Sequence, residues 1–243
     1  MASFVLVHGA WHGGWCWQRV TTALQQAGHR VHAATLTGLG ERAHLLSPSI
    51  TLDTHIDDVL NLIEAEELTD VVLAVHSYAG MVGTGVADRL GQRLRHLVYV
   101  DAVLPAPGES WSSTHDSATQ QQRLGAARAS AQFSFAPPDP QVFGLQGKDH
   151  AWVQRRQTPH PGNTYQAPLA FDVRRVAAVP RTFVSCTAPA LATIAASRLR
   201  ATDPAFWGGA WQPQARVIEL ATGHDPMVSA PGALVKILQA CSA

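Results

Sequence analysis

The sequence predicts an α/β fold in which helices cover both faces of a mostly parallel sheet. Apolar runs alternate along the chain with helical patterns, and each expected strand is almost continuously apolar, as strands buried on both faces are. The chain has 243 residues, of which 46% are hydrophobic and 15% charged, which suits a single domain with a sizeable core. We therefore expect one domain that spans residues 1–243.

The first hundred residues show this alternation most clearly. A helix over 52–67 is indicated because Ile56, Val59 and Ile63 recur on one helical face. The small residues of the helix that follows Ser77 would allow it to lie close to a sheet. Taken in order, the chain is expected to form strands at 3–8, 30–36, 70–76 and 94–104, with helices at 15–29, 52–67 and 78–90 between them.

The alternation stops after residue 104. Residues 105–178 are rich in Pro, Gln, Ala and Ser and show no strand–helix rhythm. A connection of this length is too long to be a simple loop, so we expect a lid inserted at about 105–178 over the α/β core. The rhythm then resumes with a strand at 181–187, a helix at 190–199, a strand at 215–220 and a last helix around 230–240.

Charge, cysteine content and hydropathy exclude several classes of function. Eighteen basic residues balance eighteen acidic ones, so no net field favours nucleic acid or an anionic membrane. No apolar run is long enough to span a bilayer, and no secretory signal is visible, so we expect a cytoplasmic protein. Cys16, Cys186 and Cys241 are far apart, which indicates reduced thiols and no metal site. No cofactor or metal is implied, and the oligomeric state is not indicated.

Ser77 is the strongest local signal for chemistry. It stands between the apolar strand ending at His76 and the helix beginning near Tyr78, which is typical of a nucleophile elbow. Such an elbow needs small residues two positions either side of the nucleophile. Ala79 satisfies this requirement, but Val75 stands where Gly is usual. The alternative interpretation is that Ser77 merely caps the following helix.

The stretch "VHGAWHGGWCW" at 7–17 favours the catalytic interpretation. After the first strand, it has the HG pattern of a loop that supplies one backbone N–H of an oxyanion hole, here from Ala10. The second N–H would come from Tyr78. The alternative is a plain strand-to-helix turn, and we interpret His8 and His12 as groups that hold the loop in place rather than as bases.

The stretch "LATGHDPMVSAPGAL" at 220–234 supplies the third element. His224 follows the last expected strand, and an imidazole with a pKa near 6.5 can take the serine proton and return it to the leaving group. The order of serine, then histidine late in the chain, is the one that this kind of site requires.

These motifs resemble the α/β-hydrolase superfamily, and within it the branch of plant methylesterases, the salicylate-binding esterase, hydroxynitrile lyases and bacterial esterases. The stretches "FVLVHGAWHGGWCW", "AVHSYAGM", "HLVYVDAVLP" and "GHDPMVSAP" match that branch in order. The resemblance implies Ser77 as nucleophile, His224 as base, and Ala10 with Tyr78 as oxyanion donors. Hydroxynitrile lyases of the branch carry bulkier residues in the first loop and a Lys after the base. Here Gly9-Ala10 and Asp225 stand there, which favours ester hydrolysis.

The triad acid is missing from its usual place. In the resembling branch it follows the strand equivalent to "RTFVSCT", but Pro189 occupies that position here. Three explanations remain open. The acid has moved to Asp101, at the end of a strand next to the nucleophile strand; the enzyme works as a Ser–His dyad; or catalysis is lost and the pocket binds a ligand.

The predicted activity is hydrolysis of a small hydrophobic or aromatic carboxylic ester or lactone. Hydroxynitrile-lyase-type carbon–carbon cleavage and non-catalytic ligand binding are the alternatives. Four aromatic residues of the expected lid are candidate pocket walls, although each could instead pack the lid on the core: Trp111, Phe133, Phe135 and Trp152.

Overall fold

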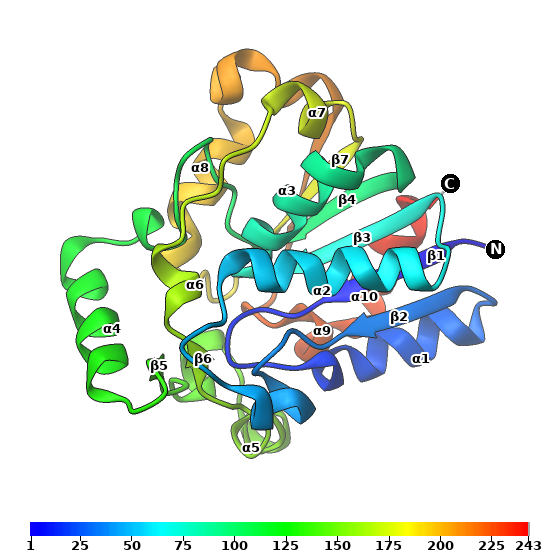
Figure 1. The fold of residues 1–243 in the computed structure, drawn as a ribbon. Coiled ribbons are helices and arrows are strands. Elements are labelled where there is room, and N and C mark those ends of the chain that lie inside the picture. Colours follow the sequence, from blue (N-terminus) through cyan, green and yellow to red (C-terminus); the bar gives the residue numbers. More distant parts are fainter. Residues whose placement is uncertain (243) are drawn as a thin grey trace.

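A six-stranded parallel sheet forms the centre of the protein (Figure 1). The computed structural model describes residues 1–242. The strand order is β2-β1-β3-β4-β7-β8, and every neighbouring pair runs parallel. The strands are β1 (Ser3–Val7), β2 (Arg30–Ala34), β3 (Val71–His76), β4 (Leu94–Val100), β7 (Arg181–Cys186) and β8 (Ala215–Leu220).

Helices cover both faces of this sheet, as predicted for an α/β fold. Helices α1 (Gln18–Gln26) and α10 (Pro231–Ala240) pack together on one face, and α2 (Leu52–Ala65) packs with α3 (Ala79–Leu90) on the other. Short 3-10 segments precede several of them. The expected helix at 15–29 begins as a 3-10 turn at Gly14–Trp17, and the one at 190–199 becomes a 3-10 turn at Ala192–Ile194 followed by α8 (Ala195–Thr202).

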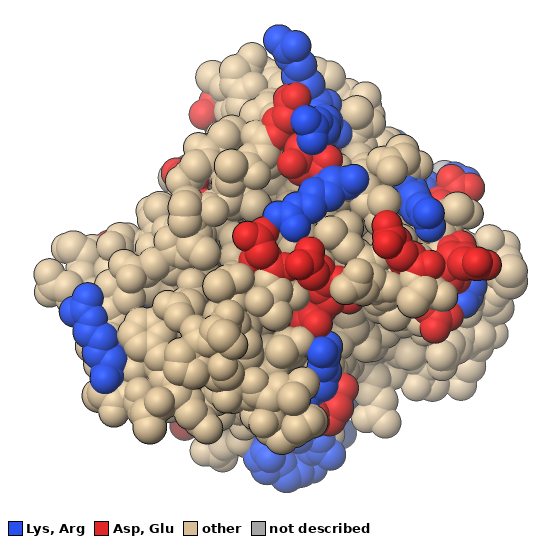
Figure 2. All heavy atoms as spheres, in the orientation of Figure 1, with Lys and Arg blue, Asp and Glu red and all other residues tan. Residues whose placement is uncertain are grey.

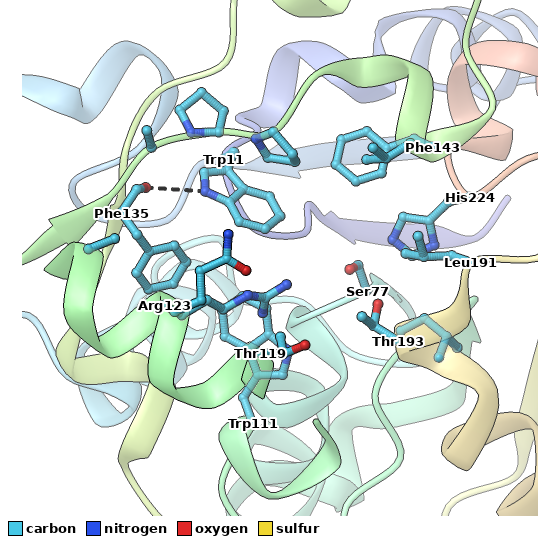
Figure 3. A pocket seen from close by; sticks show the side chains of 17 residues that line it. Trp11, Ser77, Trp111, Thr119, Arg123, Phe135, Phe143, Leu191, Thr193 and His224 are labelled. Carbon is cyan, nitrogen blue, oxygen red and sulfur yellow. Dashed lines mark hydrogen bonds between the residues drawn. The ribbon is translucent and has the colours of Figure 1, made fainter. Parts of the chain in front are cut away.

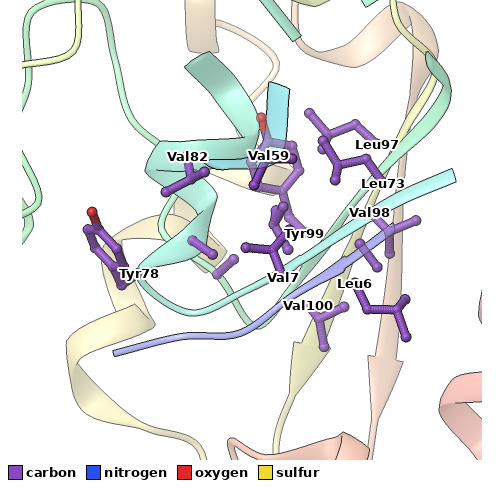
Figure 4. Close-up of a cluster of buried hydrophobic side chains, with 14 of the residues drawn as sticks. Leu6, Val7, Val59, Leu73, Tyr78, Val82, Leu97, Val98, Tyr99 and Val100 are labelled. Atoms are coloured by element: carbon purple, nitrogen blue, oxygen red, sulfur yellow. The ribbon is translucent and has the colours of Figure 1, made fainter. Parts of the chain in front are cut away.

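The apolar strands form the core that the sequence predicted. All residues of β3 and β7 are buried, whereas β8, at the sheet edge, alternates between partly buried and exposed positions. Figure 4 shows Val59 of α2 and Val82 of α3 beside strand side chains such as Leu73 and Leu97. Each aliphatic side chain buried in this way contributes about 1.5–3 kcal/mol to stability.

The segment 105–178, called here the inserted segment, lies between β4 and β7. Its antiparallel pair β5–β6 is separate from the main sheet, and in Figure 1 α4 and β5 lie beyond the end of that sheet. Its elements are α4 (Ser117–Ala129), β5 (Ser134–Phe135), α5 (Gly147–Gln154), β6 (His160–Pro161), α6 (Asn163–Gln166) and α7 (Val173–Ala177). Helix α7 returns to the core and contacts α3.

The strand expected at 94–104 is shorter than predicted. It ends at Val100 because Asp101 has a φ of 43°, in the left-handed region that ends an extended strand. The chain beyond it bends toward the end of β3, where the Val103 amide donates to the Ser77 carbonyl at 2.9 Å. Apolar periodicity continues through this bend, so it could not reveal the end of the strand.

Charged side chains mix on the molecular surface. On the face shown in Figure 2, acidic and basic groups lie beside one another. Among the ion pairs of the protein, Arg89 of α3 pairs with Asp53 and Asp57 of α2. Within the described chain, no helix combines the length and the apolar character needed to cross a lipid bilayer. The three cysteines are buried and unpaired.

Candidate active site

Ser77 lies in a sharp turn between β3 and α3. Its φ of 54° is in the left-handed region, which is strained for a residue with a side chain and is typical of a nucleophile elbow. The turn is held on both sides: the Ser77 amide donates to the Val100 carbonyl at 3.3 Å, and the Ser77 carbonyl accepts from the Gly80 amide at 3.0 Å.

Small residues allow the backbone to approach this turn closely. A Cβ on Gly9 would lie 2.7 Å from the Ser77 Cβ, and a Cβ on Gly80 would lie 1.9 Å from the Val103 carbonyl oxygen. The Val75 side chain, which departs from the expected pattern, occupies the space beside Gly83 of α3, where a Cβ would be 2.6 Å from a Val75 methyl carbon. The glycine that makes room at this turn therefore stands in the helix, at Gly83, and not in the strand, at Val75.

His224 follows β8, in a loop before α9 (Pro226–Ser229). Its backbone amide donates to the Phe143 carbonyl of the inserted segment at 2.9 Å, and its side chain is 2% exposed. Ser77 and His224 both line the same cavity, where their side chains lie near each other (Figure 3).

Asp101 is the carboxylate that contacts His224. The Asp101 Oδ2 atom accepts a hydrogen bond from His224 Nδ1 at 2.7 Å, and Asp101 is fully buried. The guanidinium of Arg198 in α8 donates to both carboxylate oxygens at 2.9 Å, and the Cys186 amide donates to Oδ1 at 3.2 Å. These donors hold the buried carboxylate in one orientation.

The two predicted oxyanion donors, Ala10 and Tyr78, belong to the loop after β1 and to the start of α3. Ala10 lies in the loop beside Ser77, and Tyr78 directly precedes the first turn of α3, where helix N–H groups have no intrahelical acceptor. Among residues 1–242, neither the Ala10 nor the Tyr78 amide donates to a protein group.

His8 and His12 hold this loop, as the sequence interpretation proposed. His8 Nδ1 donates to the Gly9 carbonyl at 2.7 Å, and His8 Nε2 accepts from the Leu36 amide at 3.0 Å. Burial lowers the pKa of His8 to about 3, so it is neutral. The His12 Nδ1 atom donates to the Ala10 carbonyl at 2.8 Å.

A second buried carboxylate, Asp225, holds the same loop through His12. It accepts from His12 Nε2 at 3.1 Å. Burial opposes the charge on both groups, but their mutual attraction outweighs it, raising the pKa of His12 and lowering the pKa of Asp225 to about 2. His76 completes the network by donating from Nε2 to the His224 carbonyl at 2.9 Å.

Ligand-type atoms of His76, His224 and Asp225 lie within 4.8 Å of one another, the one such group in the described chain. His76 donates to the His224 carbonyl, and His224 Nδ1 donates to Asp101. His224 is the predicted base and Asp225 already accepts from His12, so we assign no metal to the group.

A cavity of about 470 Å³ opens above Ser77 and His224. Two of the four predicted wall residues, Trp111 and Phe135, line it. The prediction is wrong for the other two. Trp152 packs edge-on against Trp15 at 5.1 Å between ring centroids, and Phe133, with a φ of 48°, lies against the backbone of Gly162.

Sequence reasoning missed three residues of this site: Trp11, Arg123 and Arg198. Trp11 has a φ of 64° and its indole lines the cavity. Arg198 is 97 positions from its partner Asp101, and Arg123 lies in the inserted segment, where the chain has no recognisable pattern.

Comparisons with known proteins identify the family of the chain. The family model described as "Alpha/beta hydrolase family" matches residues 4–237. The "Carbendazim hydrolyzing esterase" of Nocardioides sp. (strain SG-4G) is 41% identical over 250 residues, which cover 99% of each chain. Methylesterase 7 of Arabidopsis thaliana is 26% identical over 252 residues, covering 97% of this chain and 94% of the relative.

Solved structures share the fold. An extracellular alpha/beta-hydrolase from a Paenibacillus species superposes with a TM-score of 0.81 at 19% identity, covering 99% of both chains. The Arabidopsis methylesterase MES16 superposes with a TM-score of 0.76 at 20% identity, covering 99% of this chain and 98% of that one. The chain therefore belongs to the alpha/beta hydrolase family, and its relatives are carboxylic ester hydrolases.

Proposed function

We propose that the protein is a serine esterase that hydrolyses small hydrophobic or aromatic carboxylic esters or lactones. The observation that carries the proposal is the 2.7 Å hydrogen bond between Asp101 and His224, in a buried loop that shares a cavity with Ser77 in a strained elbow. This is the arrangement of nucleophile, base and orienting acid that acyl transfer needs.

In the first half-reaction, Ser77 Oγ attacks the ester carbonyl while His224 Nε2 accepts the serine proton. Asp101 keeps the other ring nitrogen protonated, so that Nε2 is free to act as base. The Ala10 and Tyr78 amides would donate to the oxyanion, each contributing about 3 kcal/mol to the stability of the transition state. His224 then returns the proton to the departing alcohol, which leaves an acyl group on Ser77.

In the second half-reaction, water replaces the alcohol. His224 takes a proton from the water, the resulting hydroxide attacks the acyl carbonyl, and the acid leaves as Ser77 regains its proton. For a lactone, the alcohol is part of the acyl group, so this step releases a single hydroxy acid. The aromatic and aliphatic lining of the cavity suits a hydrophobic substrate.

We further propose that the inserted segment acts as the lid of this site. Its residues supply one wall of the cavity, and its Phe143 carbonyl holds the His224 backbone. The relative at 41% identity is named an esterase, which supports the reaction class.

The rival functions lack a supporting observation. In a hydroxynitrile-lyase-type site a cation would follow the base, whereas Asp225 follows His224 and is engaged by His12. A ligand-binding protein without catalysis has no need of a carboxylate hydrogen-bonded to His224. Asp101 at this position favours an active hydrolase.

Labelling with a serine-reactive fluorophosphonate tests the proposal. We expect the wild-type protein to be labelled and to hydrolyse p-nitrophenyl acetate, and the Ser77→Ala variant to lose both activities. The matched control is Ser49→Ala, at an exposed serine outside the cavity, which should behave as wild type. Folded wild-type protein that takes up no label would refute the hydrolase assignment.

A further inference from the structure

Arg123 of α4 brings a positive charge into the cavity that contains Ser77. Among the residues that line the cavity, it is the one Lys, Arg, Asp or Glu, and Figure 3 places it across the cavity from His224. Within residues 1–242, no Asp or Glu forms an ion pair with it. By contrast, Arg198 and Arg200 in α8 pair with Asp101 and Glu109.

The polar neighbours of this guanidinium are neutral. Its Nη1 atom lies 3.4 Å from His115 Nε2, and it also hydrogen-bonds the Tyr165 hydroxyl. Burial, together with the nearby Arg123 charge, lowers the pKa of His115 to about 3, so His115 carries no charge at neutral pH. A guanidinium has five N–H donors, and two neutral acceptors leave most of them available to a ligand.

Four aromatic rings surround the guanidinium and remove it from water. Its central carbon lies 4.9 Å from the Trp111 ring centroid, 5.4 Å from Tyr165, 5.5 Å from Trp11 and 6.0 Å from Phe135. Cation–π contacts of this kind hold the group in place but do not neutralise it. A partly buried cation without a counter-ion is costly, and an anion on the ligand would offset that cost.

Building on the serine esterase proposed above, we propose that Arg123 binds a carboxylate of the substrate and so determines specificity. The substrate class would be half-esters: an aromatic or apolar body with the scissile ester at Ser77 and a free carboxylate at Arg123. The planar guanidinium can donate to both carboxylate oxygens, and Trp11, Trp111 and Phe135 offer flat apolar walls to the body between them.

A pair of isosteric esters tests this inference. Methyl 4-carboxybenzoate carries the anion, and methyl 4-carbamoylbenzoate has the same shape without the charge; the 3-substituted pair covers a shorter reach. For at least one pair we expect a wild-type kcat/KM about 10-fold or more in favour of the carboxylate. In the Arg123→Met variant, we expect kcat/KM for the carboxylate ester to fall about 10- to 100-fold and that for the carbamoyl ester to change less than about 3-fold.

The matched control is Arg128→Met, which removes the same charge from an exposed position of the same helix. It should leave both esters unaffected. Arg123→Lys should restore part of the preference, because it keeps the charge but not the planar pair of donors. If Arg123→Met weakened both esters equally, or if wild type did not discriminate within either pair, Arg123 would be only a structural residue and the inference would be wrong.

Binding to the Ser77→Ala variant separates this inference from the esterase proposal. Calorimetry should show the carboxylate ester bound at least 10-fold more tightly than the carbamoyl ester, and Ser77→Ala/Arg123→Met should lose the difference. If the Ser77→Ala variant shows this preference but the wild-type protein neither cleaves esters nor takes up fluorophosphonate, only the esterase proposal is refuted. Hydrolysis of p-nitrophenyl acetate with equal binding of both esters would refute the anion site alone.

Discussion

Asp101 directly follows the end of β4 and accepts a hydrogen bond from His224. Because β4 is the parallel neighbour of β3, the Asp101 carboxylate lies at the same end of the strands as Ser77, the C-terminal end. The position after β7, where relatives with the resembling motifs carry an acid, holds Pro189, and the Ala188 amide there donates to the Thr222 carbonyl at 3.0 Å. The loop after β7 thus makes a backbone hydrogen bond, whereas the loop after β4 carries the carboxylate that contacts His224.

Removing the Asp101 charge tests its role directly. Asp101→Asn should lower kcat about 10³- to 10⁴-fold with p-nitrophenyl acetate, because an amide does not hold His224 in the tautomer that leaves Nε2 free. Turnover within a few-fold of wild type would show that Asp101 does not act as the triad acid.

Asp225→Asn provides the comparison for that variant. Asp225 is equally buried and adjacent to His224, but it bonds His12 rather than the proposed base. We expect a much smaller loss of kcat and a larger loss of stability, about 3 kcal/mol, since His12 would lose its counter-ion. Thermal unfolding and steady-state kinetics on both variants separate the two roles.

At single positions, what could be predicted depended on local pattern. Ser77 and His224 stand in short motifs whose order along the chain is meaningful, so they could be proposed from sequence. The choice among Asp101, a dyad and lost catalysis could not be made, because it depends on a contact between residues 123 positions apart. The roles of Arg198 and Arg123 also depend on distant partners, and no motif marks either residue.

At the scale of elements, the glycines of α3 allow the helix to pack closely against its neighbours. Gly80, in its first turn, faces the backbone at Val103, and Gly83 receives the Val75 side chain. The small residues of this helix predict its close packing on the sheet. The predicted end of β4 is wrong, because the left-handed φ of Asp101 belongs to one residue and leaves apolar periodicity unchanged.

A pair of glycine substitutions tests this view of α3. Gly80→Ala should destabilise the protein by more than about 3 kcal/mol, because the new Cβ would lie 1.9 Å from a backbone carbonyl oxygen that cannot move aside. Gly125→Ala, in the exposed part of α4 where a Cβ would meet nothing within 4 Å, should stabilise it by about 0.5–1 kcal/mol. Urea unfolding of both variants measures the difference, and equal effects would contradict the close contact.

At the scale of the whole molecule, the fold buries an unusual set of histidines around the site. His8, His55, His76 and His160 are each at most 1% exposed. Burial lowers the pKa of His8 to about 3 and of His55 to about 4, and lowers the pKa of His76 and His160 well below the ordinary value. The native protein therefore holds these four rings neutral at a pH where the unfolded chain would protonate them.

This difference predicts that the protein loses stability in mild acid. Between pH 6.5 and about 4 the unfolded state binds more protons at these four sites than the native state, so the free energy of unfolding falls as pH falls, by about 1.4 kcal/mol per pH unit for each ring. His12 acts in the opposite direction: Asp225 raises its pKa, so its contribution is complete below pH 6.5 and is lost as pH rises through the raised value. One such group offsets only part of the four, and burial also lowers the pKa of His96 to about 4 and of His115 to about 3, which act in the same direction as the four rings.

Urea unfolding at pH 7.5 and 5.5 should therefore show a net loss of at least about 4 kcal/mol, because each of the four buried rings costs about 1.4 kcal/mol over this interval and His12 offsets at most about one of them. His55→Asn removes one of these titrating groups, so it should reduce the pH-dependent loss by about 1.4 kcal/mol, whatever it does to stability at pH 7.5. His44→Asn, at an exposed position, is the matched control and should leave the loss unchanged. A free energy of unfolding that stays constant between the two pH values would mean that the native state accepts protons at these rings, and the buried neutral cluster would be wrong.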